Sequence, residues 1–274
     1  QDFDGDRCHA PRNPPDTAER ETQMSFSIQG KTAIVTGAGR GIGLAIARHF
    51  EEAGAKVMFA DSDEALLEAE LGDQMNGEGD IRGFAGDLGQ KLTLANLVSA
   101  TVDAFDRIDI LVNAHRMVQA CDPMSVTEDL LGDMLRENMI SGLRLSQMVA
   151  KRMVAQAEEA DAEALQNGAI INVSSLAANW PPPKMLAYSI SSAAQAQATR
   201  SLAAALAPKR IRVNGVAFAS IMSNVLQQKL REDADLRARM IASTPLGRIA
   251  GADELAATVQ FLASDASGFV TGQI

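Results

Sequence analysis

A glycine-rich turn between a short apolar strand and an Ala-rich helix constrains the fold of this chain more than any other feature. Residues 34–43 read Ile-Val-Thr-Gly-Ala-Gly-Arg-Gly-Ile-Gly, and an amphipathic run follows over residues 44–50. Gly37, Gly41 and Gly43 allow a tight turn and a close backbone approach, while the first helical turn offers free N–H groups to an anion. This pattern predicts a pyrophosphate site. A plain glycine-rich turn is the alternative, because the spacing is not the common G-x-G-x-x-G.

Strands alternate with helices along most of the chain. We expect strands at residues 32–36, 56–60, 81–85, 108–113, 169–174 and 212–217, and helices at residues 42–53, 64–75, 91–105, 129–156, 188–206 and 253–262. This alternation predicts right-handed crossovers and a single α/β, doubly wound Rossmann domain over residues 24–274, with a parallel sheet flanked by helices on both faces. Only the beginning of a further strand follows residue 271, so we expect the last strand to be truncated.

Residues 1–23 differ from the rest of the chain because they are polar, Pro-rich and without helical or strand periodicity. We interpret them as a disordered leader or an upstream extension before a natural start at Met24.

Charge and cysteine content narrow the class of partner. The net charge is −10 and no basic stripe occurs, which argues against nucleic-acid or membrane binding and favours a small molecule. Cys8 and Cys121 are far apart, and the three histidines are scattered, so we expect neither a disulfide framework nor a metal site. A reducing cytoplasm fits this cysteine usage. No apolar run reaches the roughly 18 residues that a membrane span needs, and no signal-peptide pattern is present.

Polar residues follow several of the expected strands, where ligands bind in parallel sheets. Asp61 closes the second strand, and its carboxylate can accept hydrogen bonds from an adenosine ribose and repel a 2′-phosphate, which favours NAD over NADP. The alternative is that Asp61 caps the next helix. Asp87 and Asn113 end the third and fourth strands, although each could simply cap a turn. The acidic run at residues 157–166 is interpreted as a solvated extension of a helix.

The only tyrosine in the chain, Tyr188, lies thirteen residues after Ser175, which follows the fifth strand. Several further motifs occur in the same order along the chain: the glycine turn, Asn113-Ala114, Asn138, Thr-Pro-Leu-Gly-Arg at 244–248 and Phe-Leu-Ala-Ser-Asp at 261–265. Together with Ser175 and Tyr188, these motifs make the chain resemble a classical short-chain dehydrogenase/reductase. The resemblance covers essentially residues 27–274 and is strongest to the branch that contains 3-oxoacyl-acyl-carrier-protein reductases.

This resemblance implies an NAD(P)-dependent oxidoreductase that interconverts a ketone, 3-oxoacyl-like or small and hydrophobic, and a secondary alcohol by hydride transfer. It implies that Tyr188 is the general acid/base, that Ser175 holds the substrate oxygen and that Asn138 supports a proton-relay water. The residues expected to bind the cofactor are Gly37, Arg40, Gly41, Ile42, Gly43, Asp61, Asp87, Leu88, Asn113, Ala114 and Ser223. The family resemblance and the Ala/Ser-rich helix after Tyr188 suggest a homo-oligomer, a dimer or a homotetramer.

Three positions depart from the family pattern. Ser192 stands where the family has a lysine one helical turn after the tyrosine, a lysine that lowers the pKa of a phenol that otherwise titrates near 10. The family's Asn-Asn-Ala-Gly has become Asn-Ala-His-Arg, which introduces His115 and Arg116, and Pro-Gly has become Phe218-Ala.

These departures allow alternative interpretations of individual residues and of the function. Arg116 and Lys184 are candidate replacements for the missing cation. The simpler interpretations are that Arg116 is a surface residue and that Lys184 is an ordinary loop charge. His115 is either a candidate base or a structural residue. A catalytically silent family member, acting as an oligomer partner or a binding protein, is the alternative function. The Met-containing segment at residues 218–241 is expected to form an irregular substrate lid, or helices that dock on the core.

Overall fold

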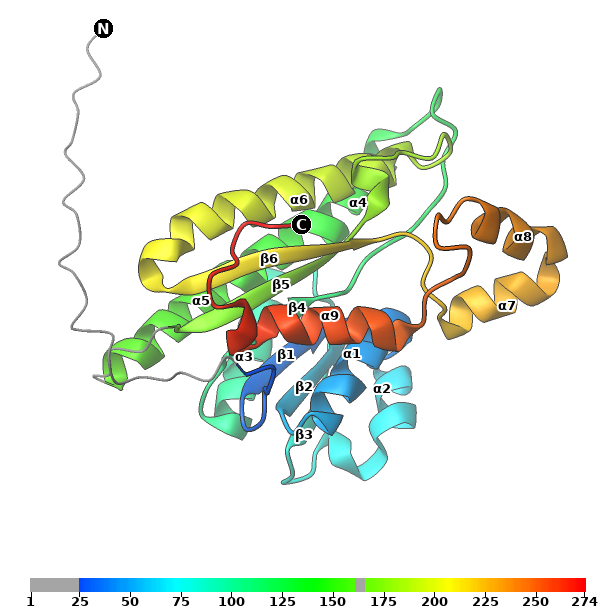
Figure 1. Cartoon of the computed structure of the whole chain (residues 1–274). Helices are drawn as coiled ribbons and strands as arrows, with labels where there is room; N and C mark the ends of the chain where they lie inside the picture. The colour runs from blue at the N-terminus through cyan, green and yellow to red at the C-terminus, as the bar shows by residue number, and fades with distance from the viewer. Residues whose placement is uncertain (1–24, 161–165) are drawn as a thin grey trace, which may run out of the picture.

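Six parallel strands form one sheet in the order β3-β2-β1-β4-β5-β6, as the computed structural model shows for residues 25–160 and 166–274 (Figure 1). The strands are β1 (Thr32–Thr36), β2 (Lys56–Asp61), β3 (Ile81–Ala85), β4 (Ile110–Asn113), β5 (Gly168–Ser175) and β6 (Ile211–Phe218). The doubly wound prediction is therefore confirmed. The expected leader and residues 161–165 of the acidic run lie outside the described residues.

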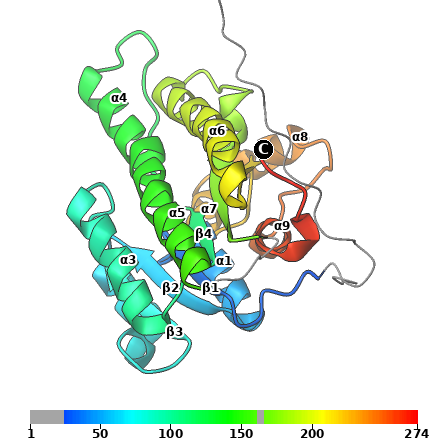
Figure 2. The same ribbon diagram turned by 90° about the vertical axis from the view of Figure 1, so that its left-hand side faces the viewer.

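Helices cover both faces of the sheet (Figure 2). They are α1 (Gly41–Glu52), α2 (Glu64–Leu71), α3 (Lys91–Phe105), α4 (Glu128–Leu135), α5 (Ser141–Glu159), α6 (Leu186–Leu206), α7 (Asn224–Glu232), α8 (Ala234–Ala242) and α9 (Ala252–Ala263). Helices α1, α2 and α9 bury apolar residues such as Phe50 on one face, and α3, α5 and α6 bury residues such as Leu97 on the other. Burial on both faces explains why the strands read as continuous apolar runs. Within the described residues, no helix combines the length and apolarity of a membrane span.

The order of the strands reverses at β1, which pairs with β2 on one side and with β4 on the other. The chain leaves β1 toward α1 and leaves β4 toward α4, so the connecting segments diverge beyond the carboxyl ends of these two strands. Such a divergence leaves a crevice in which ligands of doubly wound folds bind. The glycine turn lies directly above it.

The long helix expected at residues 129–156 contains a break in its regular pattern. Helix α4 ends at Leu135, a π-helical turn spans Arg136–Ile140, and α5 then continues from Ser141. Asn138 lies in this turn. A π turn inserts one extra residue and re-aims the side chains around it, which is why such turns are common at functional sites.

The segment after β6 is helical, so of the two expectations the irregular lid is wrong and the alternative of helices agrees with the structure. Helices α7 and α8 follow each other and project away from the sheet (Figure 1). Ser223 and Asp233 supply the caps: Ser223 Oγ accepts a hydrogen bond from Leu226 N (3.2 Å) and Asp233 Oδ1 accepts one from Leu236 N (2.9 Å). A single parallel bridge between Ile221 and Ala250 closes the base of this excursion. Local capping, which the apolar pattern did not reveal, explains the difference.

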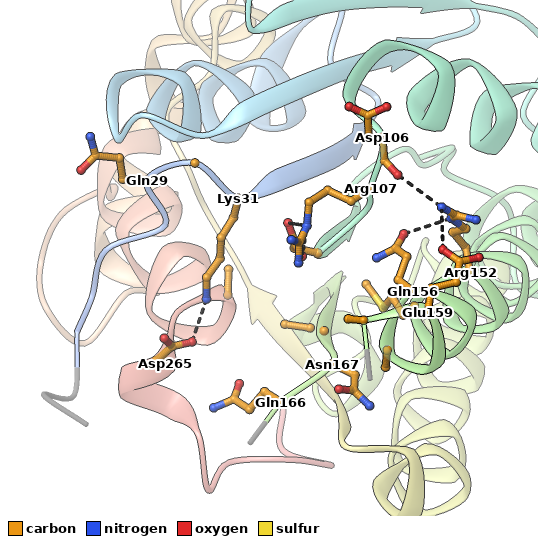
Figure 3. Close-up of a pocket in the computed structure, with 18 residues that line it drawn as sticks. Gln29, Lys31, Asp106, Arg107, Arg152, Gln156, Glu159, Gln166, Asn167 and Asp265 are labelled. Carbon is orange, nitrogen blue, oxygen red and sulfur yellow. Dashed lines mark hydrogen bonds and ion pairs between the residues drawn. The ribbon is translucent and has the colours of Figure 1, made fainter. Parts of the chain in front are cut away.

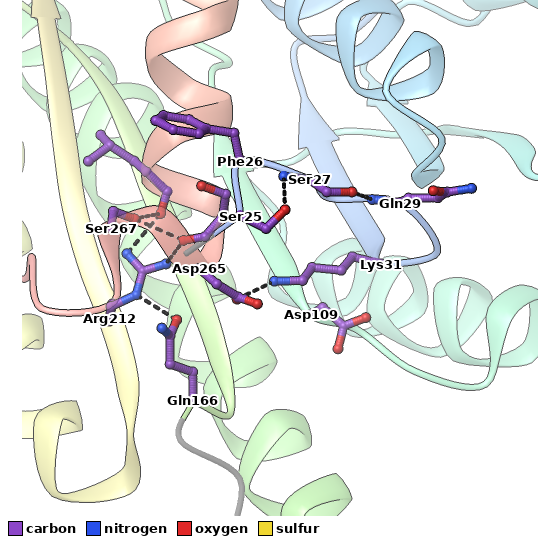
Figure 4. Close-up of polar contacts among 12 residues, drawn as sticks. Ser25, Phe26, Ser27, Gln29, Lys31, Asp109, Gln166, Arg212, Asp265 and Ser267 are labelled. Carbon is purple, nitrogen blue, oxygen red and sulfur yellow. Dashed lines mark hydrogen bonds and ion pairs between the residues drawn. The ribbon is translucent and has the colours of Figure 1, made fainter. Parts of the chain in front are cut away.

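Arg212 is a buried arginine that joins three segments at the amino end of β6 (Figure 4). Its Nε donates to Gln166 Oε1 (2.8 Å), Nη1 to the Leu262 carbonyl (2.8 Å) and Nη2 to the Ser264 carbonyl (3.1 Å). Burial lowers the pKa of Arg212 to about 10, while Asp265 acts in the opposite direction, so the side chain stays charged at neutral pH. These bonds fix the end of α9 to the sheet.

The tail that follows this junction runs beside β6. Gly272 N donates to the Val213 carbonyl, and Gly215 N donates to the Gln273 carbonyl, both at 2.8 Å. These backbone bonds are those of a sheet edge, although residues 271–274 are not themselves assigned as a strand. The expected beginning of a further strand thus lies beside β6, in the position that the next strand of the sheet would occupy.

Candidate active site

A cavity of about 700 Å³ opens beyond the carboxyl ends of β1, β2, β3 and β4. Ten of the eleven residues expected to bind the cofactor line it: Gly37, Arg40, Gly41, Ile42, Gly43, Asp61, Asp87, Leu88, Ala114 and Ser223. The exception is Asn113, which is only 1% exposed and whose Nδ2 donates to Ser146 Oγ (3.0 Å) and Asn172 Oδ1 (2.8 Å). Asn113 therefore ties β4 to β5 and α5 below the cavity.

Residues that the sequence did not point to also line this cavity. They are Ser62, Met117, Val118 and Glu137. Ser62 follows Asp61 and Glu137 precedes Asn138, so only their position next to expected site residues could have indicated that they line the cavity. Met117 and Val118 continue the loop after β4, which carries no motif of its own.

The glycine turn is shaped by close backbone contacts. A Cβ on Gly43 would collide with the carbonyl oxygen of Gly37, and a Cβ on Gly37 would stand 2.8 Å from the Cα of His115. Gly37 and Gly41 have φ angles of +67° and +63°, where side chains other than glycine are strained. Gly41 faces open space, at the first residue of α1. The turn thus presents bare backbone and a helix N-terminus to the cavity, a surface that fits a pyrophosphate.

The Asp61 carboxylate is held against this turn. Its Oδ2 accepts a hydrogen bond from Gly39 N (2.9 Å), and its Oδ1 accepts one from Asp63 N (3.1 Å). Asp63, not Asp61, caps α2, because Asp63 Oδ1 accepts from Leu66 N (3.2 Å). Asp61 is left with a fixed carboxylate at the cavity wall.

A second acidic group stands on the wall above β3. Asp87 Oδ1 accepts from Gly89 N (2.9 Å), so this aspartate does cap a turn while it lines the cavity. Glu137 comes from the π turn beside it. Partial burial raises the pKa of Glu137, and the nearby charge of Asp87 raises it further.

His115 lies at the cavity wall and cross-links the end of β1 to the start of α5. Ser141 Oγ donates to the Glu137 carbonyl (2.8 Å), so it accepts from Nε2–H of His115 at 2.6 Å. Thr36 Oγ1 lies 2.7 Å from His115 Nδ1 and 3.4 Å from the Val112 carbonyl, so the shorter contact makes Nδ1 the better acceptor of its proton. Burial lowers the pKa of His115 to about 4. The neutral ring with Nε2–H satisfies both contacts, which favours the structural interpretation over a catalytic base.

Asn138 fixes the geometry of the loop after β4. Its Oδ1 accepts from Met117 N (2.7 Å), and its Nδ2 donates to the Met117 carbonyl (2.9 Å) and to Ser191 Oγ (3.0 Å). The side chain is 5% exposed. The π turn therefore places one amide between the cavity loop and α6.

Ser175 and Tyr188 come from neighbouring elements. Ser175 ends β5, and its Oγ accepts from Ala177 N (3.2 Å), which leaves its proton available to a ligand. Tyr188 lies in the first turn of α6, is 5% exposed and packs with Met134 and Ala177 in a small apolar cluster. Neither residue lines the 700 Å³ cavity; both stand beyond it, toward β5 and β6.

Arg116 connects the cavity with Tyr188, and it is not the surface residue that the sequence suggested. Its guanidinium carbon lies 4.3 Å from the centre of the Phe218 ring and 5.8 Å from that of the Tyr188 ring, and Nη1 donates to the Ser174 carbonyl (3.1 Å). Burial lowers the pKa of Arg116, while Tyr188 acts in the opposite direction.

Another cavity of about 700 Å³ lies at the amino ends of the strands, away from the glycine turn (Figure 3). Its charged side chains are bonded to one another: Lys31 to Asp265 and Arg107 to Asp109, both at 2.7 Å. Ligands of parallel sheets bind at the carboxyl ends instead. The candidate site is therefore the cavity at the glycine turn.

Known proteins resemble this chain along most of its length. The family model described as Enoyl-(Acyl carrier protein) reductase matches residues 37–274. The chain is 34% identical to Dehydrogenase/reductase SDR family member 4 of Caenorhabditis elegans, over 90% of this chain and 93% of that protein. It is 30% identical to a 3-oxoacyl-[acyl-carrier-protein] reductase of Thermotoga maritima, over 90% of this chain and 96% of that protein.

Solved structures agree with the sequence comparisons. The structure of 7 alpha-hydroxysteroid dehydrogenase, complexed with NADH and 7-oxo glycochenodeoxycholic acid, matches with a TM-score of 0.81 and 29% identity. The match covers 91% of this chain and 93% of that one. The protein described here thus belongs to the short-chain dehydrogenase/reductase family of oxidoreductases.

Proposed function

We propose that this protein is an NAD-linked oxidoreductase that interconverts a ketone and a secondary alcohol, the substrate being 3-oxoacyl-like or another small hydrophobic carbonyl compound. The observation that carries the proposal is the arrangement at one sheet edge: the expected cofactor residues line a single cavity, and Ser175 and Tyr188 follow directly beyond it. The relatives named as 3-oxoacyl reductase and hydroxysteroid dehydrogenase support this reaction class.

The turn at residues 37–43 suits the pyrophosphate of such a cofactor, since its glycines leave the backbone bare. The Asp61 carboxylate suits an adenosine ribose and opposes a 2′-phosphate at the same position, which supports NAD over NADP. When bound, the nicotinamide supplies or takes up the hydride.

The chain's own residues handle the proton and the substrate oxygen. Tyr188 is the proposed general acid for ketone reduction and the general base for alcohol oxidation, with its O–H as the donor. Ser175 Oγ, whose lone pair is engaged by Ala177 N, donates its proton to the substrate oxygen and orients it. Asn138 holds Met117 and Ser191 and so keeps the loop after β4 at a fixed distance from α6.

Apolar side chains favour a hydrophobic substrate. Tyr188 packs in a cluster with Met134, Ala177 and Ala187, and Met117, Cys121 and Leu131 pack against that cluster. A charged substrate would lose hydration here without a partner of opposite charge, apart from Arg116. We therefore propose a carbonyl compound with an apolar substituent.

We also propose a homo-oligomer that works in the cytoplasm. Helices α5 and α6 lie side by side, and a mostly apolar cavity of about 530 Å³, lined by residues such as Val154 and Leu202, opens between them. A second copy of the chain would cover this surface. Sedimentation velocity would distinguish a dimer or tetramer from a monomer, which is the result that contradicts the assembly.

The function is tested by titrating NADH and NADPH by fluorescence and by assaying ketones and alcohols, acetoacetyl thioesters included. Tyr188→Phe is the matched control because it removes one hydroxyl from a ring that otherwise packs unchanged. We expect NADH to bind more tightly than NADPH, and turnover to disappear in Tyr188→Phe while NADH binding remains. Absence of cofactor binding, or undiminished turnover in the variant, would overturn the proposal.

A further inference from the structure

Two of the departures from the family pattern, Arg116 and Phe218, pack against each other. Arg116 leaves the end of β4, and its guanidinium stacks on Phe218, at the end of β6, with 4.3 Å between the guanidinium carbon and the ring centre. The same group lies 5.8 Å from the centre of the Tyr188 ring and donates to the Ser174 carbonyl of β5 (3.1 Å). Arg116 thus spans the carboxyl ends of three adjacent strands and reaches α6.

Ser192 cannot supply what the family's lysine supplies. Its Oγ donates to the carbonyl of Tyr188, one turn earlier (2.8 Å), and the side chain is 4% exposed. The hydroxyl is therefore directed back along α6 and carries no charge. The phenol of Tyr188 must obtain any cationic partner from another element.

Lys184, the other candidate cation, lies on the outside. It is exposed in the loop before α6, and its described contact is a backbone one, in which its carbonyl accepts from Cys121 N (2.8 Å). Arg116, in contrast, is held by a ring and a carbonyl beside Tyr188.

An arginine suits this position for physical reasons. A guanidinium is delocalised and weakly hydrated, stacks on aromatic rings and stays charged when partly buried. A lysine ammonium in the same place would lose more hydration and would gain less from the flat face of Phe218. A cation near a phenol favours the phenolate over the phenol.

We propose that Arg116 provides, from the end of β4, the positive charge beside Tyr188 that the family's lysine provides from α6, and that Phe218 holds its guanidinium in place. Arg116 is then a positioning residue that acts through Tyr188. This inference rests on the proposed oxidoreductase function, but its test does not require turnover.

Because Tyr188 is the only tyrosine, the near-ultraviolet absorbance of phenolate reports on this residue alone. The single tryptophan, Trp180, does not ionise, and Tyr188→Phe provides the blank. The phenolate fraction is measured in the wild type, Arg116→Met, Arg116→Lys and Arg116→Met/Ser192→Lys. The comparison is made at the highest pH at which all of them keep the circular dichroism of the wild type.

We expect about a tenfold smaller ratio of phenolate to phenol in Arg116→Met than in the wild type, because the variant removes the cation beside the ring. Methionine keeps an apolar stem on Phe218, so the loss reports on charge. Arg116→Lys keeps a charge but stacks less well on Phe218, so its ratio should fall between those of the wild type and Arg116→Met. Ser192→Lys should restore the ratio in the Arg116→Met background. Equal ratios in the wild type and Arg116→Met overturn the inference, as does a failure of both lysine variants to restore the phenolate.

The inference and the proposed function fail in different ways. NADH binding and ketone turnover with equal phenolate ratios would retain the function and refute the role of Arg116. An Arg116-dependent ratio in a protein without turnover on any ketone would retain the electrostatic role and refute the oxidoreductase.

Discussion

The two halves of the candidate site lie beyond the carboxyl ends of the same sheet, but one half is formed mainly by backbone and the other mainly by side chains. Above β1 to β3, the cavity is formed by bare backbone: the turn at residues 37–43 and the start of α1. Above β4 to β6, the site is formed by side chains, with the Arg116 guanidinium at the cavity wall and beside the rings of Tyr188 and Phe218. The backbone half leaves no room for a Cβ at Gly37 or Gly43, so glycine is required at these two positions. The side-chain half requires only that a charged group reach a given point, so a residue on a different strand or helix can provide that charge.

The largest effect is expected in the backbone half, from Gly43→Ala. The added methyl collides with the Gly37 carbonyl, so we expect the free energy of unfolding to fall by about 3 kcal/mol or more and NADH binding to be lost. Urea unfolding and NADH fluorescence titration measure the two effects. Gly30→Ala is the control, because its Cβ meets open space, its positive φ alone is strained, at about 1 kcal/mol, and it does not line this cavity. Wild-type NADH binding by Gly43→Ala would contradict a backbone pyrophosphate site.

His115 stands at the boundary between the halves and makes stability depend on pH. Its pKa falls from 6.5 to about 4 on folding, so the unfolded chain takes up a proton first as the pH drops. Stability is therefore full above pH 6.5 and decreases toward pH 4, by about 3 kcal/mol in total. Urea unfolding of the wild type and His115→Ala across this range measures the difference, since the carboxylates titrate in both. Parallel curves for the two proteins would show that His115 is not buried in its neutral form.

Substitution of Asp61 tests whether its carboxylate determines the preference for NADH over NADPH. Asp61→Asn keeps an oxygen for Gly39 N but removes the charge that opposes a 2′-phosphate. We expect the preference for NADH over NADPH to fall by about tenfold, or about 1.4 kcal/mol, with unfolding nearly unchanged. Paired fluorescence titrations measure this ratio. Asp63→Asn, which changes the cap of α2 instead, should leave it unchanged.

The smallest effect is expected at Ser223, on the reactive side. Ser223→Ala removes the cap of α7 and one hydroxyl from the cavity wall, so NADH affinity should fall about threefold, or about 0.6 kcal/mol. Asp233→Ala is the matched control, because it removes the equivalent cap of α8 without lining the cavity. Equal NADH affinities in the two variants would mean that Ser223 does not face the cofactor.

The sequence predicted the parts of the molecule that depend on local pattern. The alternation of strands and helices gave the sheet, and glycine spacing and strand ends pointed to residues that line one cavity. The π turn at Arg136–Ile140 was not predicted, because the apolar spacing on either side continues a single helix.

Long-range contacts account for the remaining differences. A charged residue after a strand is normally exposed, and nothing local to Arg116 signals that Phe218 and Ser174 will enclose it. The burial of Asn113 and the neutral state of His115 likewise depend on Ser146 and Ser141, which a later helix brings to them.

The stacking of Arg116 on Phe218 makes the order of mutations matter. In the family pattern these positions hold glycine and proline, and position 192 holds lysine. Replacing Phe218 alone would leave the guanidinium without its ring, and restoring lysine alone would set two cations beside one phenol. Because the three side chains share the surroundings of one ring, the effects of substitutions at positions 116, 192 and 218 should not add.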